Sequence, residues 1–193
     1  MIVDRSSYRE CVRADLAAYG LRSVCCGVRW RLPALRFVLR LRRVEYLTNV
    51  RGFVPLRRVR LFWNRCLNHC LATRLGFSIP INVFGPGLCI VHYGTIVVSP
   101  YAKVGANCRL HPMTCIGEYN GAPTLGDNVY VGPGAKIYGK IRIGNNVAIG
   151  ANAVVNRDFG DDVTLAGVPA RVVSEVGAKE KDIFPKKVED VDN

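Results

Sequence analysis

The clearest pattern in the chain is a recurrence of aliphatic positions in its second half. An aliphatic residue returns at every sixth position from residue 125 to residue 155, and glycine follows most of these positions. A helix repeats at about 3.6 residues and a strand at 2, so a period of six predicts a solenoid of short strands and sharp turns. One side chain per six residues then points into the core. The series is Leu125, Val131, Ile137, Ile143, Ile149 and Val155.

The same spacing extends upstream and is interrupted twice. Between Ile116 and Leu125 the step is nine, which predicts a protruding loop at Glu118–Pro123. Further upstream the series is displaced by two positions, near residues 96–98. The pattern therefore predicts a mainly β solenoid that begins near residue 84 and is irregular at these two places. The upstream members are Phe84, Ile90, Ile96, Val98, Val104, Leu110 and Ile116.

Residues 1–75 lack this period and are predicted to form a helical N-terminal segment. Ser6 and Ser7 are candidate N-caps for a helix that ends near Gly20. A second helix is expected over about residues 33–48.

A third helix is predicted over residues 56–75, with Gly76 as its stop. It has an apolar stripe with i, i+3, i+4 spacing, and most of its arginines lie off that stripe. We expect the stripe to cover the open first coil of the solenoid, since an uncovered end exposes unpaired strand edges. The stripe is Val59, Phe62, Trp63, Cys66, Leu67, Cys70 and Leu71.

The 193 residues suffice for one domain with an appendage. We divide them into the helical, arginine-rich segment 1–75, the solenoid 76–173 and a polar tail 174–193. The tail is expected to hold a short helix and a loose end, because its composition is polar and mixed in charge.

The net charge of +12 comes entirely from the first of these segments. Residues 1–75 hold 16 arginines, no lysine and four acids, whereas basic and acidic residues balance over residues 76–193. Such a segment is compatible with a solvated helix face, a subunit contact, an anionic membrane surface or a nucleic acid. Trp and Phe fall on the apolar stripe rather than between the arginines, which disfavours nucleic-acid binding.

The N-terminus has acids early and no apolar segment typical of a signal peptide. The most apolar stretch, residues 76–98, is broken by prolines and glycines, whereas a membrane helix needs about 20 uninterrupted apolar residues. We therefore expect a cytoplasmic protein with no membrane span, in which peripheral membrane contact through the arginine-rich segment stays open. The eight cysteines show no CxxC pair and are expected to be reduced.

The three histidines are the first candidates for chemistry. His69 lies on the third predicted helix near Cys66 and Cys70, but a metal site lacks a fourth ligand there, and we expect no metal. His92 lies at the displacement of the six-residue series, where a groove can open. His111 follows 19 residues later, close to one coil of 18, so the two histidines can lie on neighbouring coils.

The repeat, together with His92-Tyr-Gly-Thr-Ile-Val97 and Ala166-Gly-Val-Pro-Ala-Arg171, resembles the hexapeptide-repeat acyltransferases. Within that family, the chain looks most like serine acetyltransferases and their short relatives among polysaccharide-modifying enzymes. The resemblance implies a left-handed parallel β-helix, a homotrimer and acetyl-CoA as co-substrate in a groove between subunits. It also implies that His92 is the general base that activates an acceptor hydroxyl, which suits a neutral imidazole.

Further site residues follow from the motif positions of that family. The CoA groove would involve Pro133, Ala151, Asn156, Arg157 and Arg171, with the two arginines near the CoA phosphates. The alternative is that the small residues of this set and the adjacent glycines are only corner residues of the coils. The acceptor site would be shaped by His111, Tyr93 and Glu118, together with Tyr119 and Asn120.

Some positions depart from the serine acetyltransferase pattern and leave the acceptor open between L-serine and a sugar of a surface polysaccharide. A second histidine of that family is replaced by Ala122 before Pro123, and aspartates are replaced by Val91 and by Phe77 or Ser78. Two other classes of function are alternatives. A metal-dependent hydratase like the γ-type carbonic anhydrases needs three histidines, and a non-catalytic scaffold would use only the arginine-rich helices.

Overall fold

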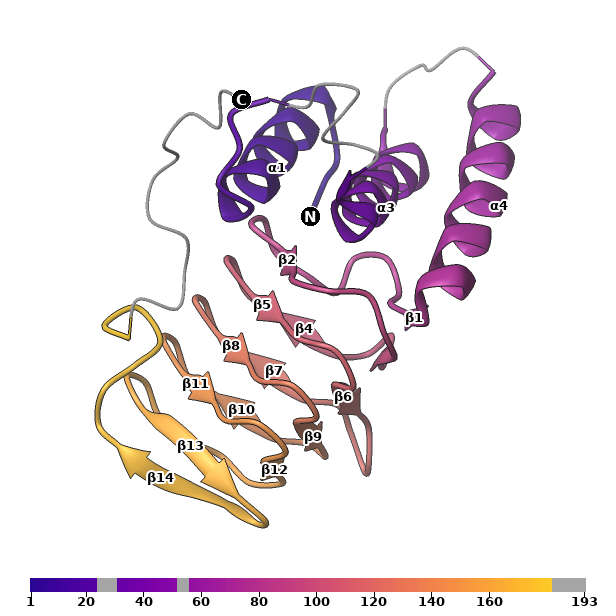
Figure 1. Ribbon diagram of the computed structural model, residues 1–193. Helices are drawn as coiled ribbons and strands as arrows, with labels where there is room; N and C mark the ends of the chain where they lie inside the picture. The colour runs from indigo at the N-terminus through magenta and orange to yellow at the C-terminus, as the bar shows by residue number, and fades with distance from the viewer. Residues whose placement is uncertain (24–30, 52–55, 182–193) are drawn as a thin grey trace.

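The computed structural model describes residues 1–23, 31–51 and 56–181. Three helices, α1 (Arg5–Ala18), α3 (Pro33–Asn49) and α4 (Arg57–Leu75), precede a β-helix that runs to the C-terminal hairpin (Figure 1). Its strands are β1 (Phe77–Ser78), β2 (Cys89–Ile90), β3 (Ile96–Val98), β4 (Lys103–Val104), β5 (Arg109–Leu110), β6 (Cys115–Gly117), β7 (Thr124–Leu125), β8 (Tyr130–Val131), β9 (Lys136–Tyr138), β10 (Arg142–Ile143), β11 (Ala148–Ile149), β12 (Val154–Val155), β13 (Thr164–Gly167) and β14 (Ala170–Ser174).

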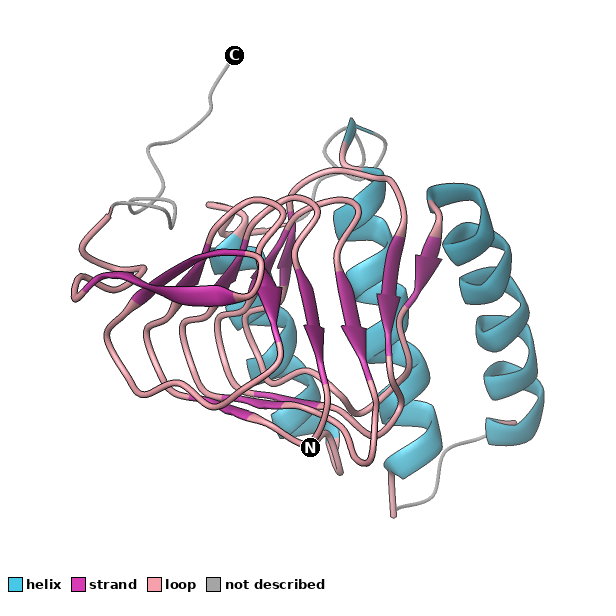
Figure 2. Cartoon of the chain, turned by 90° about the horizontal axis from the view of Figure 1, so that it is seen from below, coloured by secondary structure: helices cyan, strands magenta, loops and turns pink. Residues whose placement is uncertain are grey.

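The strands stack into three parallel walls (Figure 2). Wall A contains β1, β3, β6, β9 and β12, wall B contains β4, β7 and β10, and wall C contains β2, β5, β8, β11 and β13. Each coil of the chain passes through A, B and C in that order. β14 then turns back antiparallel to β13 and closes the last coil. The predicted parallel β-helix is therefore confirmed.

The six-residue series forms the core of the β-helix. Its members from Leu125 to Val155 are each at most 3% exposed, and the upstream members are buried as well. These side chains stack in register from coil to coil, as in Leu110–Val131–Ile149 of wall C. The period was thus a direct record of which side chains point inward.

Both predicted interruptions of the six-residue period are present in the structure at the predicted positions. Ile90 pairs with Leu110 and Val97 with Cys115, so the chain takes seven steps where the next coil takes five. Two residues are thus added at the corner between β2 and β3, which contains His92. The second interruption is the loop of residues 118–123 between β6 and β7.

The open end of the first coil is covered by α1 and α3 (Figure 1). The hydroxyl of Tyr19 donates to the carbonyl of Ile90 and accepts from its N–H, each at 2.9 Å. It therefore supplies the two hydrogen bonds that a neighbouring strand would give to the edge strand β2, which lets wall C end without an unpaired edge.

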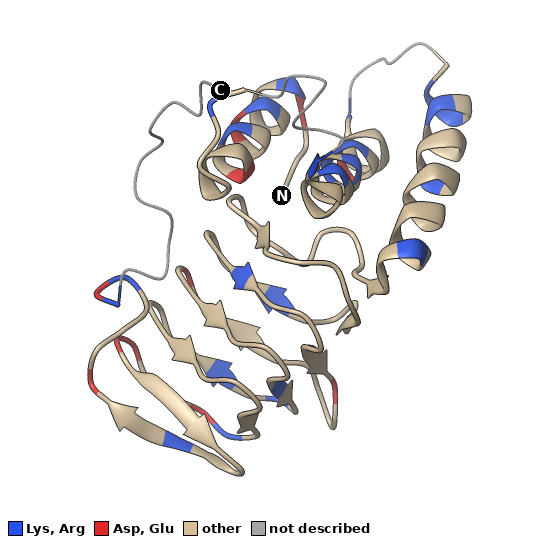
Figure 3. Ribbon diagram, viewed as in Figure 1, with Lys and Arg blue, Asp and Glu red and all other residues tan. Residues whose placement is uncertain are grey.

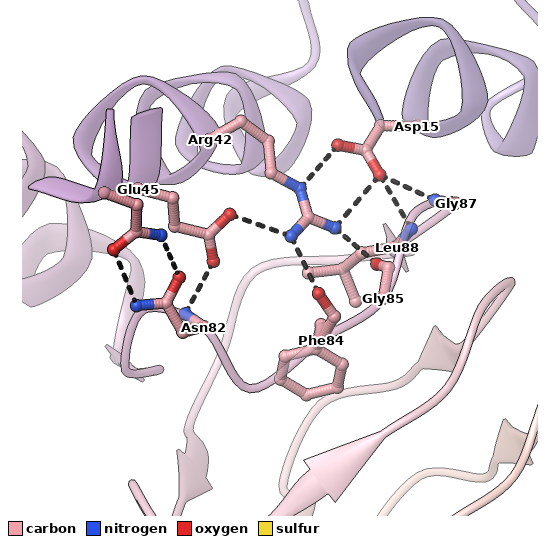
Figure 4. Close-up of polar contacts among 9 residues, drawn as sticks. Asp15, Arg42, Glu45, Asn82, Phe84, Gly85, Gly87 and Leu88 are labelled. Carbon is pink, nitrogen blue, oxygen red and sulfur yellow. Dashed lines mark hydrogen bonds and ion pairs between the residues drawn. The ribbon is translucent and has the colours of Figure 1, made fainter. Parts of the chain in front are cut away.

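A buried ion cluster completes this cover (Figure 4). The Arg42 guanidinium donates to Asp15 at 2.8 Å and to Glu45 at 3.0 Å, and also to the carbonyls of Phe84 and Gly85. Arg42 is 1% exposed, and the two carboxylates are at most 2% exposed. Asp15 also accepts from the N–H groups of Gly87 at 2.8 Å and Leu88 at 2.9 Å. The buried charges of Arg42, Asp15 and Glu45 are thus paired with one another. Arg42 and Asp15 also make hydrogen bonds to backbone groups of the first coil, which would otherwise be buried without partners.

The structure corrects two expectations about the helices. The stripe of α4 does not cover the first coil: within the stripe only Leu71 is buried, and Phe62 and Trp63 are 63% and 60% exposed. The N-cap of α1 is Asp4 rather than Ser6 or Ser7. Its carboxylate accepts from the N–H of Ser7 at 2.8 Å, and Ser7 returns the contact as the third residue of a capping box.

Other expectations hold within the described residues. Gly76 ends α4 in the left-handed conformation, and Cys11, Cys66, Cys70, Cys89, Cys108 and Cys115 are free thiols. Burial raises the pKa of Cys89 to about 11, so it stays protonated at neutral pH. Across the part of the chain that the structure describes, helices fall short of the length and apolarity that a membrane crossing requires. Cys25 and Cys26, and the end of the predicted tail from residue 182, lie outside the described residues.

Candidate functional site

His92 lies at the corner between walls C and A, where the chain has two extra residues. Val91 still pairs through its N–H with the carbonyl of Leu110 at 3.0 Å, and Gly94 pairs with Leu75 at 3.0 Å. The intervening His92 and Tyr93 project from this corner, and both are exposed. The widened corner therefore presents the imidazole to solvent rather than to the core. A side chain exposed in this way can contact a substrate.

The strand register places several predicted residues on this same edge of the β-helix. Ile90, Leu110, Val131 and Ile149 pair in succession, so the residues that follow them occupy one corner on four successive coils. Pro133 and Ala151 are exposed at this corner, two and three coils beyond His92. At a spacing of about 4.8 Å per coil, Ala151 lies roughly 14 Å along the edge from His92.

Two arginines are associated with the C-terminal hairpin at the far end of this edge. Arg171 lies on β14 and pairs with Ala166 of β13, the wall C strand of the last coil. Arg157 follows the wall A strand β12, so its backbone lies beside Asn156 at the corner between walls A and B. Its side chain reaches the hairpin, where Nη2 donates to the carbonyl of Ala170 at 3.4 Å, and its guanidinium carbon lies 5.2 Å from the centroid of the Phe159 ring. An exposed edge with an imidazole at one end and guanidinium groups at the other suits an extended anionic ligand.

Glu118 and Asn156 lie elsewhere in this chain. Both follow wall A strands, at the corner between walls A and B, and both are exposed. Glu118 accepts from the hydroxyl of Ser99 at 2.7 Å, which fixes its carboxylate beside the loop of residues 118–123. Within one subunit, the structure therefore does not bring Glu118 and Asn156 to His92.

His111 is held beside His92 by contacts that the sequence did not indicate. Its ring packs edge-on against Tyr130 with centroids 5.0 Å apart, and its Nε2 is buried without a hydrogen-bond partner in the described part of the chain. Burial lowers the pKa of His111, and the neighbouring Arg109 and His92 lower it further. This shift favours a neutral His111 ring at neutral pH.

Arg109 and Tyr130 were missed as site residues by the sequence reasoning. They are Cα partners on wall C, and each precedes an inward aliphatic residue. The repeat places residues one position before the series in one outward column, but it does not indicate which of them belong to a site. Burial raises the pKa of Tyr130, so its hydroxyl stays protonated at neutral pH.

The glycines of this edge are required by the stacking of the coils. A Cβ on Gly132 would lie 2.7 Å from the carbonyl oxygen of Ile149 and 2.9 Å from the nitrogen of Ala151. Those contacts come from the next coil of the same chain. The interpretation of Gly132 as a corner residue therefore has direct structural support.

Replacing Gly132 by alanine should accordingly lower the free energy of unfolding by about 1–3 kcal/mol, because backbone must shift to admit the methyl group. Gly160→Ala is the matched control, since a Cβ there meets nothing within 4 Å. Urea denaturation of both variants tests the difference. Unchanged stability in Gly132→Ala would contradict the packing argument.

The comparisons with known proteins agree with this geometry. Residues 122–157 match the family model "Bacterial transferase hexapeptide (six repeats)". A serine acetyltransferase of Synechococcus elongatus is 39% identical over 121 residues, which cover 60% of this chain and 50% of that protein. The chain thus spans about half the length of this curated relative.

Solved structures extend the similarity to most of the chain. A serine acetyltransferase of Brucella abortus superposes with a TM-score of 0.70 at 26% identity, covering 90% of this chain and 71% of that one. A serine acetyltransferase solved in complex with CoA superposes with a TM-score of 0.66 at 26% identity, over 88% of this chain and 71% of that one. The predicted resemblance is therefore confirmed: the chain contains hexapeptide repeats in a parallel β-helix and is similar to serine acetyltransferases.

Proposed function

We propose that the protein is an acetyl-CoA-dependent O-acetyltransferase with His92 as its general base. The observation on which this rests is the exposed edge that links His92, Pro133 and Ala151 and ends at the hairpin of Arg171, which the side chain of Arg157 reaches from the neighbouring corner. The similarity to a serine acetyltransferase solved with CoA supports the same assignment. On this edge the pantetheine arm would lie along Pro133 and Ala151, and Arg157 and Arg171 would meet the phosphates.

The proposed reaction uses the imidazole of His92 twice. The neutral ring takes the proton of the acceptor hydroxyl while the oxygen attacks the carbonyl carbon of the thioester. The tetrahedral intermediate then expels the CoA thiolate, which recovers that proton from the imidazolium, so the enzyme returns to its starting state. Acetyl-CoA supplies the activated acyl group, and backbone N–H groups would stabilise the oxyanion. No metal takes part in this scheme.

His111 and Tyr93 are proposed to bind the acceptor next to the base. The His111 ring lies at this corner and packs against Tyr130, and a turn of the ring would present its unpaired, buried Nε2 to a substrate oxygen. Tyr93 is 67% exposed at the same corner and adds a hydroxyl and an apolar face. The acceptor would thus lie across the corner of two coils.

A homotrimer would complete the site. Glu118 and Asn156 face away from His92 within one chain, but they lie on another exposed edge of the same β-helix. Packing three β-helices around an axis would bring that edge of a neighbour toward His92, so Glu118 and the loop that follows would come from the second subunit. We place the enzyme in the cytoplasm, where acetyl-CoA is available.

L-serine is the first candidate for the acceptor, because the similar proteins are named serine acetyltransferases. A sugar hydroxyl is the second candidate, and the loop of residues 118–123 favours it. The position of the second histidine in the serine enzymes is Ala122 here, and Ala122 packs against the hydrophobic core instead of projecting from the loop. Val91 likewise leaves no carboxylate next to His92 to bind an amino group.

A thiol-release assay tests the proposal. The protein is incubated with acetyl-CoA and either L-serine or a panel of sugars, and free CoA is followed with a thiol reagent. We expect acceptor-dependent release that is absent without acceptor. If no acceptor in either class releases thiol above the background hydrolysis, the proposed activity is refuted.

The charge state of His111 can be tested by pH. Because its pKa lies below the ordinary 6.5, the folded protein binds fewer protons here than the unfolded chain. As the pH falls from 6.5 towards the lower pKa of His111 in the folded protein, the unfolded chain takes up a proton first, so the free energy of unfolding decreases. In an NMR titration of the ring Hε1 signals, Arg109→Gln should move the His111 pKa upward. Arg142→Gln, at the equivalent position on wall B, should leave it unchanged.

A further inference from the structure

The outward face of α4 is an apolar surface that nothing in the described chain covers. Leu71 is buried on the inward side, where Arg57 also donates to the carbonyls of Leu47 and Thr48 at the end of α3. At about 100° per residue, Leu71, Ala72 and Leu75, which pack on the core, define one side of the helix, and Val59, Phe62 and Trp63 lie on the other side. Leu67, one turn before Leu71, lies at the margin of this outward face. The exposed fractions are 53% for Val59, 63% for Phe62, 60% for Trp63 and 46% for Leu67. Both ribbon views place α4 at the margin of the molecule (Figures 1 and 2).

Arginines flank this outward face on both sides. The helix contains five arginines and no acid between Arg57 and Leu75. Arg58 and Arg65 lie at one margin of the apolar side and Arg60 at the other, whereas Arg74 lies in line with Trp63 and Leu67 at the C-terminal end of the helix. Figure 3 shows this helix with basic positions along its length and no acidic one. An apolar stripe with aromatic side chains between rows of arginine is the pattern of a helix that lies in a membrane interface.

We propose that the outward face of α4 docks the protein on an anionic lipid surface. Phe62, Trp63 and Leu67 would enter the boundary between headgroups and acyl chains, and the flanking arginines would pair with the headgroups. The excess charge of the whole protein lies in residues 1–75, so the rest of the molecule would not oppose this orientation. Such docking would hold the active edge close to acceptors that are themselves attached to the membrane.

Two other occupants fit the surface less well. A second copy joined through the same face would bring eight arginines together without a carboxylate from either helix, which is unfavourable. A nucleic acid would pair with the arginines but would leave Val59, Phe62 and Leu67 without an apolar environment, because stacking platforms need aromatic rings between the cations. A lipid interface supplies both the negative charge and the apolar layer.

Liposome flotation with the full chain tests the proposal. Vesicles of phosphatidylcholine with 30 mol% phosphatidylglycerol, a composition chosen for the test, should bind the protein, and vesicles of phosphatidylcholine alone should bind it far less. At about 1 kcal/mol per arginine near the surface, Arg58→Gln with Arg65→Gln should weaken binding roughly 20- to 30-fold. Phe62→Ser with Trp63→Ser should weaken it at least about tenfold. Tyr101→Ser, which alters a 73% exposed aromatic side chain away from α4, should bind as the wild type does.

The other occupants give different results. Light scattering after gel filtration measures the mass of the wild type and of the Phe62/Trp63 variant in the absence of lipid. A smaller assembly for the variant would assign the face to a second copy and overturn the proposal. Equal binding to neutral and anionic vesicles would also overturn the proposal. So would the absence of vesicle binding together with salt-sensitive binding to single-stranded DNA that the arginine variant loses. Thiol release from a water-soluble acceptor reports separately on the proposed activity.

Discussion

His92→Ala is expected to lower kcat for acetyl transfer by about 10²- to 10⁴-fold, because it removes the group that takes the proton of the acceptor hydroxyl. The side chain is exposed at the widened corner, so the loss should not disturb the core. Steady-state thiol release against acceptor concentration measures kcat and KM separately. A fall in kcat with a nearly constant KM is expected of a general base.

His69→Ala is the matched control for this variant. It makes the same chemical change on α4, at an exposed position on a different element. It should keep the wild-type kcat with a soluble acceptor, and both variants should keep the wild-type midpoint in urea. Full activity in His92→Ala would remove the proposed mechanism, whereas loss of the urea transition would show a structural role.

Arg42→Met is expected to lower the free energy of unfolding by about 3–5 kcal/mol, because it leaves two carboxylates buried without their partner. Asp15 and Glu45 are both within 3.0 Å of the guanidinium. Two backbone carbonyls, of Phe84 and Gly85, also lose their donor. Arg42 therefore joins α1 and α3 to the first coil through polar contacts that Met cannot replace. Urea unfolding followed by circular dichroism gives the difference.

Arg43→Met controls for the loss of an arginine at the neighbouring position of α3. Arg43 is half-buried, and its substitution should change stability by no more than about 0.5 kcal/mol, as for most positions near the surface. A further variant, Arg42→Met with Asp15→Leu and Glu45→Leu, should recover only part of the loss. Asp15 also accepts from Gly87 and Leu88, and those N–H groups would stay unpaired. Equal stability of Arg42→Met and the wild type would contradict the capping role.

The β-helix was predictable because its information is local and periodic. Each inward position, such as Ile137 or Ile149, repeats the same environment, so a spacing along the chain is sufficient to assign it. The interruptions were predictable for the same reason, since an added residue shifts every later position. His92 was found through such a shift, and the loop of residues 118–123 through another.

The assembly of the site was only partly predictable. The edge that joins His92 to Pro133 and Ala151 follows from the strand register, which the period implies. The packing of His111 against Tyr130 and the effect of Arg109 on its pKa depend on outward side chains of neighbouring coils. Outward positions are not constrained by a core, so their residue types show no period that a sequence reading can use.

The sequence by itself thus determined the coils, their core and the position of the proposed base, because burial in a repeating structure leaves a regular record in the chain. Only the tertiary structure decided how the helices meet the first coil. Arg42 contacts Asp15, 27 positions before it, and Gly85, more than 40 positions after it. No spacing along the chain predicts such contacts. Likewise, the sequence predicts that the apolar stripe of α4 covers the first coil, whereas the helix packs on the core through Leu71, Ala72 and Leu75. Phe62 and Trp63 lie on the other side and stay in solvent, since a helix packed on one side must expose the other.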